Sequence, residues 1–442
     1  MPYTPHTPSD IEAMTAQIGI TSEEELFASI PQELRAKSFE IPKGLSEFEV
    51  FEELKALALK NNTQNICFLG GGYYEHIIPS AVDALSMRSE FYTAYTPYQP
   101  EASQGTLQAL YEYQSMICEL TGMEATNASM YDGGTAMAEA ALMAVRITKR
   151  KKILIDSGVN PIYIKIVKTY LAYHELEVEL LHVSSDISKK EDILTKIDET
   201  YAGYIFQNPN FFGSIADYTD VIEALHVKGI LAIASAYPIS LGLLKTPKEM
   251  DADIVCADGQ CLGNYLGFGG PSFGILATKE KYIRNLPGRI VGETLDRNGK
   301  RAFVLTLQAR EQHIRRDKAT SNICSNQNLM ALRATIFFSL LGKEGFANLA
   351  EFNYEKANYL KNELSKVVGI YNLAPTFNEF VIELPISSDK FIKAMNEKGF
   401  FAGINLSNLY ENFENRVLVS VTEKRTKAQM DSFVQATKEV LI

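Results

Sequence analysis

Three short apolar runs, 204-YIF-206, 230-ILAIAS-235 and 254-IVC-256, indicate the fold class of this chain of 442 residues. A helical pattern over residues 221–227, which ends at Gly229, separates the first run from the second. Strands that are apolar throughout and alternate with helices are typical of a mostly parallel sheet with helices on both faces. The sequence therefore predicts an α/β fold in which ligands bind at the carboxyl ends of the strands.

The same alternation extends outward from these runs and defines three expected parts of the chain. Further strands are predicted at 153–155, 176–183 and 273–277, and helices at 103–121, 135–148 and around 164–167. From about residue 330 a helix (329–366), two strands (380–384 and 417–421) and a last helix from Thr426 predict a smaller unit. We expect an N-terminal helical arm (1–65), a large domain (66–330) and a small C-terminal α+β domain (331–442).

The arm is polar and has no obvious core of its own, and Ser9-Asp10 is predicted to cap its first helix. The whole chain carries 43 Lys and Arg against 54 Asp and Glu, a formal net charge of -11, which argues against nucleic-acid or membrane-surface binding. Its five Cys form no C-x-x-C pair and no zinc spacing, as expected for free thiols in a reducing compartment. Without a secretory pattern or a spanning apolar run, we expect a cytoplasmic protein without a metal site.

A glycine turn, Asp132-Gly133-Gly134-Thr135, leads into a predicted helix. Backbone N–H groups and the helix dipole at such a turn suit a phosphate or a carboxylate. The same residues can form an ordinary loop with an Asp cap, and taken alone they favour that interpretation. The stretch from Phe268 to Gly274 also leaves two interpretations open: close backbone approach to a ligand or subunit, or a tight turn into an edge strand.

Two further stretches are unusual in composition. Residues 91–101 contain four aromatic residues and two prolines, which predicts a rigid binding loop. Residues 310–318 form a basic cluster that could bind an anion or an acidic partner, although ion pairs on a helix surface are the usual interpretation of such a run. His76 and His313 match no nucleophile signature and are interpreted as structural.

Together these stretches resemble glycine dehydrogenase (decarboxylating), the P-protein of the glycine cleavage system. The resemblance covers nearly the whole chain and is carried by Tyr95 to Glu101, Ser129 to Ala136, Asp258 to Gln260, Phe268 to Pro271 and Leu307 to Arg316. The length fits the form of the family that is split into two subunits, and the motifs are similar to its subunit 1, the alpha subunit. The resemblance implies a pyridoxal phosphate (PLP)-dependent transferase fold of type I, aminotransferase-like. It also implies PLP-dependent decarboxylation of glycine and transfer of the aminomethyl group to a lipoyl arm.

This sequence departs from the resemblance at two positions that the chemistry needs. A lysine must form the Schiff base with PLP, and an acid must keep the ring nitrogen protonated. Against the PLP-binding subunit of the family, the lysine position falls on Gln260, and the acid position falls on Ser235-Ala236-Tyr237. We therefore expect no catalytic residue and no PLP in this chain alone. The resemblance then implies a vestigial cofactor pocket formed by Asp132, Gly133, Gly134, Thr135 and Gln260.

The resemblance also implies the partners. PLP would be held by glycine dehydrogenase subunit 2 (beta) in a heterotetramer, and the other partners would be glycine and the lipoylated H-protein. The aromatic loop would complete the partner's site as a substrate or interface loop, with Tyr95, Thr96, Tyr98 and Gln99 as its polar contacts. Two alternatives stay open: an autonomous PLP enzyme that uses another lysine, such as Lys245, and a non-catalytic regulator derived from the family.

Overall fold

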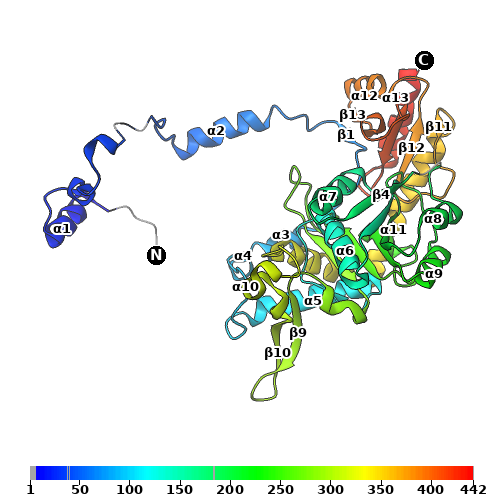
Figure 1. Ribbon diagram of the computed structural model, residues 1–442. Coiled ribbons are helices and arrows are strands. Elements are labelled where there is room, and N and C mark those ends of the chain that lie inside the picture. Colours follow the sequence, from blue (N-terminus) through cyan, green and yellow to red (C-terminus); the bar gives the residue numbers. More distant parts are fainter. Residues whose placement is uncertain (1–5, 37, 39, 183–184, 442) are drawn as a thin grey trace. The chain divides into compact units, whose positions relative to one another are not determined.

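The computed structural model describes residues 6–36, 38, 40–182 and 185–441 (Figure 1). The chain forms two compact units, Met1–Thr63 and Gln64–Ile442. Because residues 64–442 form a single compact unit, the expected boundary near residue 330 stays a prediction.

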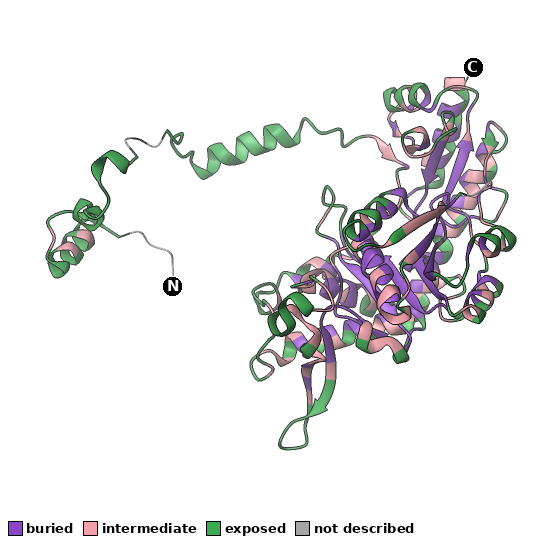
Figure 2. Ribbon diagram, in the orientation of Figure 1, coloured by how far each residue is buried: buried purple, intermediate pink, exposed green. Residues whose placement is uncertain are grey.

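The first unit consists of short helices without a core. Its elements are α1 (Pro8–Ile18), the 3-10 helices η1 (Glu23–Phe27) and η2 (Gln32–Leu34), and α2 (Glu47–Ala58). None of its described residues is buried, and Figure 2 shows it almost entirely in the colour of exposed residues. Capping boxes begin α1 and α2, whereas η1 and η2 have no side-chain cap. The cap of α1 is Thr7, paired with Asp10 in a capping box, so the predicted Ser9-Asp10 cap is wrong by two residues.

A seven-stranded sheet organises the second unit, in the order β2-β8-β7-β6-β5-β3-β4. Strands β3 to β7 are parallel, and β8 is antiparallel to β7, which confirms the predicted mostly parallel sheet. Because β8 pairs with both β7 and β2, the interpretation of an edge strand after Phe268 is wrong. The strands are β2 (Ala125–Thr126), β3 (Lys152–Asp156), β4 (Glu177–Leu181), β5 (Tyr201–Asn208), β6 (Leu231–Ala236), β7 (Ile254–Asp258) and β8 (Gly274–Thr278). The predicted end of β4 at residue 183 lies outside the described residues.

Side chains alternate between the two faces of this sheet, as the two-residue period of a strand requires. Ile153 and Ile155 pack with the Ala- and Met-rich side of α6, whereas Leu154 packs in the cluster of α8 and α9. Val255 and Ala257 of β7 pack in a third cluster, with α5 and α11. Figure 2 shows the sheet and the inner sides of its helices as the buried centre of this unit. The helices of this unit before residue 330 are α3 (Ser80–Ser86), α4 (Ser89–Tyr92), α5 (Gln104–Thr121), α6 (Gly133–Thr148), α7 (Pro161–Leu171), α8 (Lys190–Lys196) and α9 (Thr219–Val227).

The remainder of the second unit adds a hairpin and a smaller antiparallel sheet. The hairpin, β9 (Ile290–Leu295) and β10 (Arg301–Thr306), was not predicted. The smaller sheet has the order β11-β12-β15-β14, and β1 (Ile66–Cys67) pairs separately with β13 (Phe400–Phe401). The other elements are α10 (Gln312–Arg315), α11 (Asn328–Leu364), β11 (Gly369–Ile370), β12 (Glu379–Glu383), α12 (Ser388–Glu397), β14 (Ile404–Asn405), β15 (Arg416–Ser420) and α13 (Lys427–Leu441).

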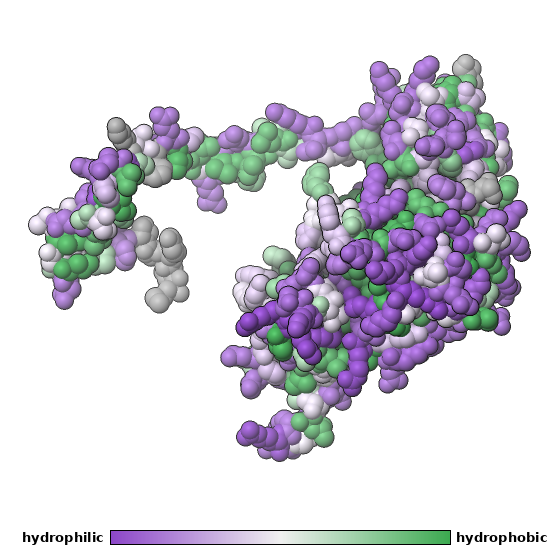
Figure 3. Space-filling model, in the orientation of Figure 1, coloured by the Kyte–Doolittle hydropathy of each residue, from purple (hydrophilic) through white to green (hydrophobic). Residues whose placement is uncertain are grey.

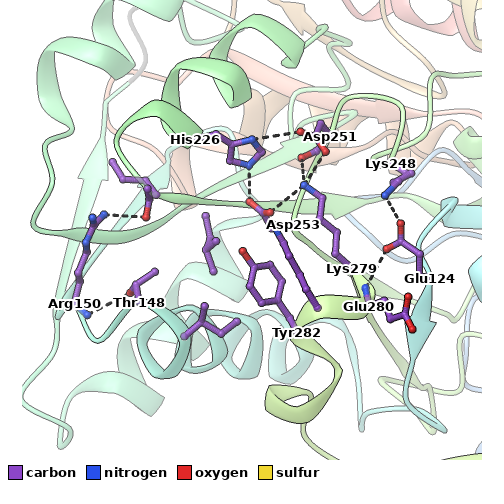
Figure 4. Close-up of a pocket in the computed structure, with 15 residues that line it drawn as sticks. Glu124, Thr148, Arg150, His226, Lys248, Asp251, Asp253, Lys279, Glu280 and Tyr282 are labelled. Atoms are coloured by element: carbon purple, nitrogen blue, oxygen red, sulfur yellow. Dashed lines mark hydrogen bonds and ion pairs between the residues drawn. The ribbon is translucent and has the colours of Figure 1, made fainter.

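A partly buried ionic network lies at the end of the sheet where β6 and β7 begin (Figure 4). The Asp253 carboxylate accepts hydrogen bonds from the Ala232 N–H at 3.0 Å and from Lys279 Nζ at 3.0 Å, and it contacts His226 Nε2 at 2.7 Å. Asp251 pairs with Lys279 at 2.7 Å and with His226 at 3.4 Å. These groups line a hollow of about 790 Å³. Since Lys248 and Lys279 pair with acids of the same chain and Arg150 donates to backbone carbonyls, we interpret the hollow as structural.

Replacing Asp253 with Asn should destabilise the protein by about 3 kcal/mol at neutral pH, because the buried Lys279 loses the buried one of its two charged partners. Burial would raise the pKa of Asp253, but the hydrogen bonds from His226 and the Ala232 N–H outweigh it and hold that pKa below its usual value. The carboxylate therefore stabilises the fold above its unfolded-state pKa, and this contribution is lost as the pH falls through the lowered folded-state pKa.

Urea denaturation of the wild type and of Asp253→Asn at pH 7 and near pH 4 measures this difference. Asp251→Asn is the matched control, since the Asp251 side chain is 63% exposed and its loss should cost much less. Equal losses for the two variants at pH 7 would contradict the assignment.

Candidate functional site

The carboxylate of Asp258 lies at the opposite end of the strands, where β7 ends. One oxygen, Oδ2, accepts hydrogen bonds from the Gly133 N–H at 2.9 Å and from the Tyr73 hydroxyl at 3.0 Å. The other, Oδ1, accepts from the Gln260 N–H at 2.8 Å and from Ser272 Oγ at 2.6 Å. Burial raises the pKa of Asp258, and these four donors act against that shift. The anion at the N-terminus of α6 is thus supplied by the chain itself.

The glycine turn before α6 is packed against this carboxylate. Asp132 Oδ1 accepts from the Thr135 N–H at 2.8 Å, and Thr135 Oγ1 accepts from the Asp132 N–H at 3.2 Å, which is a capping box. At Gly133 a Cβ would lie 2.8 Å from both Asp258 Cβ and Tyr163 Oη. Asp132 and Thr135 therefore make the contacts of a capped turn, and the backbone at Gly133 is covered by protein atoms.

Gln260 is buried, and its amide group is fully hydrogen-bonded. Its Oε1 accepts from the Tyr74 N–H at 3.0 Å, while its Nε2 donates to the Tyr74 carbonyl at 3.0 Å and to the Asn264 carbonyl at 2.9 Å. The ring of Phe273 covers Gly259, where a Cβ would lie 2.1 Å from a ring atom. The side chain at position 260 therefore fastens a distant segment of backbone to the end of β7.

The end of β6 offers a hydroxyl in place of an acid. Tyr237 follows this strand, and its hydroxyl lies 2.7 Å from His76 Nε2. The other ring nitrogen of His76 lies 2.8 Å from Glu423 Oε2, so the buried His76 has a structural role in this network. Lys245 points elsewhere, because its Nζ bonds Asp217 at 3.0 Å on a side chain that is 43% exposed.

A second buried carboxylate, Glu379, was not predicted as part of this region. It accepts hydrogen bonds from the Gly71 N–H at 2.7 Å and from the Tyr74 hydroxyl at 2.7 Å. The run Gly70-Gly71-Gly72 permits this approach, because a Cβ at Gly70 would lie 2.2 Å from Glu379 Oε1. That glycine run was the signal available in the sequence. Burial raises the pKa of Glu379 to about 7.

The aromatic loop, residues 91–101, begins in the last residues of α4 and leads towards α5, and it has its own set of contacts. Tyr95 is 81% exposed, whereas the Tyr98 hydroxyl accepts a hydrogen bond from the Arg289 guanidinium at 3.1 Å. The ring of His313 meets the Tyr98 ring edge-on at 5.7 Å. Thr96 is half-buried and Gln99 is exposed. Tyr98 thus contacts Arg289 and His313, not Asp258 or Gln260, and Arg289 carried no recognisable signal in the sequence.

Within the described residues, no group of three or more His, Cys, Asp or Glu side chains is placed to hold a metal ion. In the same part of the chain, all five cysteines are unpaired. No described helix has the length and apolar character that a membrane span requires.

Comparison with known proteins identifies the fold first. Glutamate decarboxylase from Lactobacillus brevis superposes with a TM-score of 0.69 at 13% identity, covering 94% of this chain and 97% of that chain. A NifS-like protein superposes with a TM-score of 0.64 at 12% identity, covering 85% of this chain and 99% of that one. The fold is therefore that of the PLP-dependent transferases of fold type I, as predicted.

The sequence comparisons give the family. The model of the glycine cleavage system P-protein family matches residues 1–437. Probable glycine dehydrogenase (decarboxylating) subunit 1 from Citrifermentans bemidjiense is 54% identical over 100% of both chains, and that from Maridesulfovibrio salexigens is 48% identical over 98% of this chain and 99% of its own. The crystal structure of glycine decarboxylase (P-protein) of the glycine cleavage system, in inhibitor-bound form, superposes with a TM-score of 0.91 at 43% identity over 100% of both chains. This chain belongs to the glycine cleavage system P-protein family.

The residues at the end of the sheet do not fit PLP, the cofactor of this fold. An imine needs a primary amine, but Gln260 is an amide whose donors and acceptor are all used within the chain. The position for an anion at the N-terminus of α6 holds the Asp258 carboxylate. The end of β6 carries Tyr237 where a carboxylate would be needed.

We predict that Gln260→Lys does not create a PLP enzyme. The new amine would lie among the Tyr74 and Asn264 backbone groups without an acid at the end of β6. The Tyr74 N–H would also lose its acceptor, at a cost of about 2 kcal/mol. Absorbance spectra after incubation with PLP, together with thermal unfolding, measure both effects. Gln108→Lys, on the exposed side of α5, is the control for adding a lysine. An aldimine band specific to Gln260→Lys and trapped by borohydride would contradict the prediction.

We also predict a pH-dependent contribution of Glu379 to stability. Because burial raises the pKa of Glu379 to about 7, the folded protein binds a proton that the unfolded chain releases near its ordinary value. Stability should therefore fall as the pH rises from about 4.5 to about 7, by about 3 kcal/mol for this group.

Denaturation of the wild type and of Glu379→Gln at several pH values between 4.5 and 8 tests this contribution. The neutral amide should remove this part of the slope. Glu383→Gln, at the half-exposed end of the same strand, should keep it. An identical slope in wild type and Glu379→Gln would show that another group is responsible.

Proposed function

We propose that this chain is the alpha subunit of a two-subunit glycine decarboxylase and that the second subunit holds PLP. The complex decarboxylates glycine and transfers the remaining aminomethyl group to the lipoyl arm of the H-protein. The observation that carries the proposal is that Gln260 and Asp258 are hydrogen-bonded within the chain. The full-length relatives of this chain are probable glycine dehydrogenase (decarboxylating) subunit 1. The chain retains the fold of the family while its own side chains fill the cofactor position.

The loop after Asn264 supports a role in binding a second subunit. Tyr265 and Leu266 are exposed, and Phe268 is fully exposed at 103% with a left-handed backbone (φ 55°). Stable subunit interfaces bury apolar and aromatic side chains of this kind in their cores. We assign the surface of residues 265–271 to the contact with the second subunit. Other apolar side chains reach the surface in both units (Figure 3).

The aromatic loop is the proposed contribution of this chain to the catalytic site of its partner. Tyr98 is held in place by Arg289 and His313, and Tyr95 projects into solvent from the same loop. A phenol held in this way loses little conformational freedom when it binds a substrate. Tyr95, Thr96, Tyr98 and Gln99 are therefore proposed to contact glycine or the partner's site across the interface.

Expression of this chain with and without a subunit 2 tests the proposed function. The two-subunit complex should bind PLP and exchange CO2 with glycine in the presence of lipoylated H-protein, and the single chain should do neither. PLP bound by the single chain and lost in Lys245→Ala would support an autonomous enzyme. Failure to bind subunit 2 would leave the chain as a non-catalytic relative of the family.

Tyr98→Phe should lower kcat/KM for glycine about tenfold in the complex, the effect of one hydrogen bond. The Arg289 guanidinium would also lose its phenolic acceptor. Tyr95→Phe should have a similar effect if its hydroxyl meets the substrate. Steady-state decarboxylation measures both variants against Tyr173→Phe, a tyrosine that is 94% exposed after α7. Kinetics equal to those of Tyr173→Phe in both variants would reject the assigned role of the loop.

A further inference from the structure

The surface beside the aromatic loop carries cations that the chain does not neutralise. His313, Ile314, Arg315, Arg316, Asp317 and Lys318 are all exposed and form the basic segment. Across the described part of the chain, Arg315, Arg316 and Lys318 make no ion pair with an acid. The interpretation of residues 310–318 as ion pairs on a helix surface therefore fails for these three cations. They remain available to a partner.

The basic segment is held to the body of the second unit at its base. The half-buried Arg310 donates to the carbonyl of Gly288 at 2.6 Å and to that of Leu286. The Thr320 N–H donates to the Arg310 carbonyl at 3.0 Å, which closes the segment into a loop. Within it, Arg315 Nε donates to the Ala309 carbonyl at 2.9 Å. The base of the segment and the Arg315 side chain are therefore held by hydrogen bonds to the backbone.

One ring contact joins the basic segment to the aromatic loop, and Arg289 lies against the same tyrosine. The His313 ring packs against the Tyr98 ring. The Arg289 guanidinium lies 5.3 Å from the centroid of the same Tyr98 ring. Arg289 is 8% exposed and has no acid partner among the described residues, since its other hydrogen bonds go to Ser325 Oγ and Asn326 Oδ1. Positive charge without an acid partner therefore extends from the basic segment to Arg289 at the base of the aromatic loop.

The composition of the basic segment indicates the kind of contact it makes. Stable subunit interfaces are depleted of charge in their cores, whereas charged surfaces steer short-lived encounters and are screened by salt. The basic segment has one large apolar side chain, Ile314, and otherwise charged or ionisable groups. The exposed residues 265–271 have the opposite character. The two surfaces thus fit different partners, one permanent and one transient.

We propose that the basic segment and the aromatic loop form one docking surface for the acidic face of the protein that carries the lipoyl acceptor. The proposal rests on the function proposed above, because a carrier must bring its arm to the entrance of the site that the aromatic loop completes. In a chain with a net charge of -11, a local positive surface at that entrance orients an acidic carrier. Carboxylates on the carrier pair with Arg315, Arg316 and Lys318.

The test uses the two-subunit complex with Arg316→Glu and Lys318→Glu combined. The apparent KM for the lipoylated carrier should rise at least about tenfold at low ionic strength and should lose most of its salt dependence, while kcat at saturating carrier is kept. Lys390→Glu with Lys393→Glu is the matched control. It makes the same change of net charge at two exposed lysines of α12 and should leave the KM for the carrier unchanged.

Equal carrier KM values in the two double variants would overturn the proposal. Loss of subunit 2 on size-exclusion chromatography of Arg316→Glu/Lys318→Glu would also overturn it and would assign the basic segment to the permanent interface. Failure of the proposed function gives a different result, because the wild-type complex would then not decarboxylate glycine at any carrier concentration. Direct binding of the carrier to the complex without glycine gives a second readout, with weaker binding expected only for the basic-segment variant.

Discussion

The arrangement of the second unit depends on one buried carboxylate, that of Asp258. It joins the N-terminus of α6, the end of β7, the segment around Tyr73 and the strand entry at Ser272 through four hydrogen bonds. A carboxylate without these donors would be costly to bury, and the first turn of α6 without an anion would leave a backbone N–H unpaired. The Gly133 N–H donates to the Asp258 carboxylate, so each group has its hydrogen-bond partner within the chain and neither requires a ligand.

Gln260 extends the same arrangement to a distant part of the chain. Its amide bonds the backbone of Tyr74, which is 186 residues away in the sequence. Tyr74 in turn donates to Glu379 at the start of β12, so the end of the central sheet and the smaller sheet are connected through buried polar groups. Under the function proposed above, the positions that a PLP enzyme would use for its cofactor serve internal packing in this chain.

The sequence predicted the central strands because each is a continuous apolar run bounded by turn residues, as at 254-IVC-256. It did not predict β9 and β10, although residues 302–305 of β10 are apolar, because the second half of its partner β9 is largely polar and exposed and offers no strand pattern. The absence of lysine at position 260 was visible in the sequence, but the bonds of Gln260 were not. They depend on a tertiary contact that no local pattern records. Arg289 was missed for the same reason, because its partner Tyr98 is 191 residues away.

The first unit has a consequence for the life of the chain in the cell. Its described residues include none that is buried, and α2 exposes Phe48, Phe51 and Leu54. Such a segment gains no stability from a core, and exposed backbone of this kind is where proteases cut and where chains aggregate. Until another surface covers it, this unit is open to proteolysis and aggregation. A cell that makes an excess of this chain over its binding partner should therefore degrade the surplus, so that turnover keeps the two in balance.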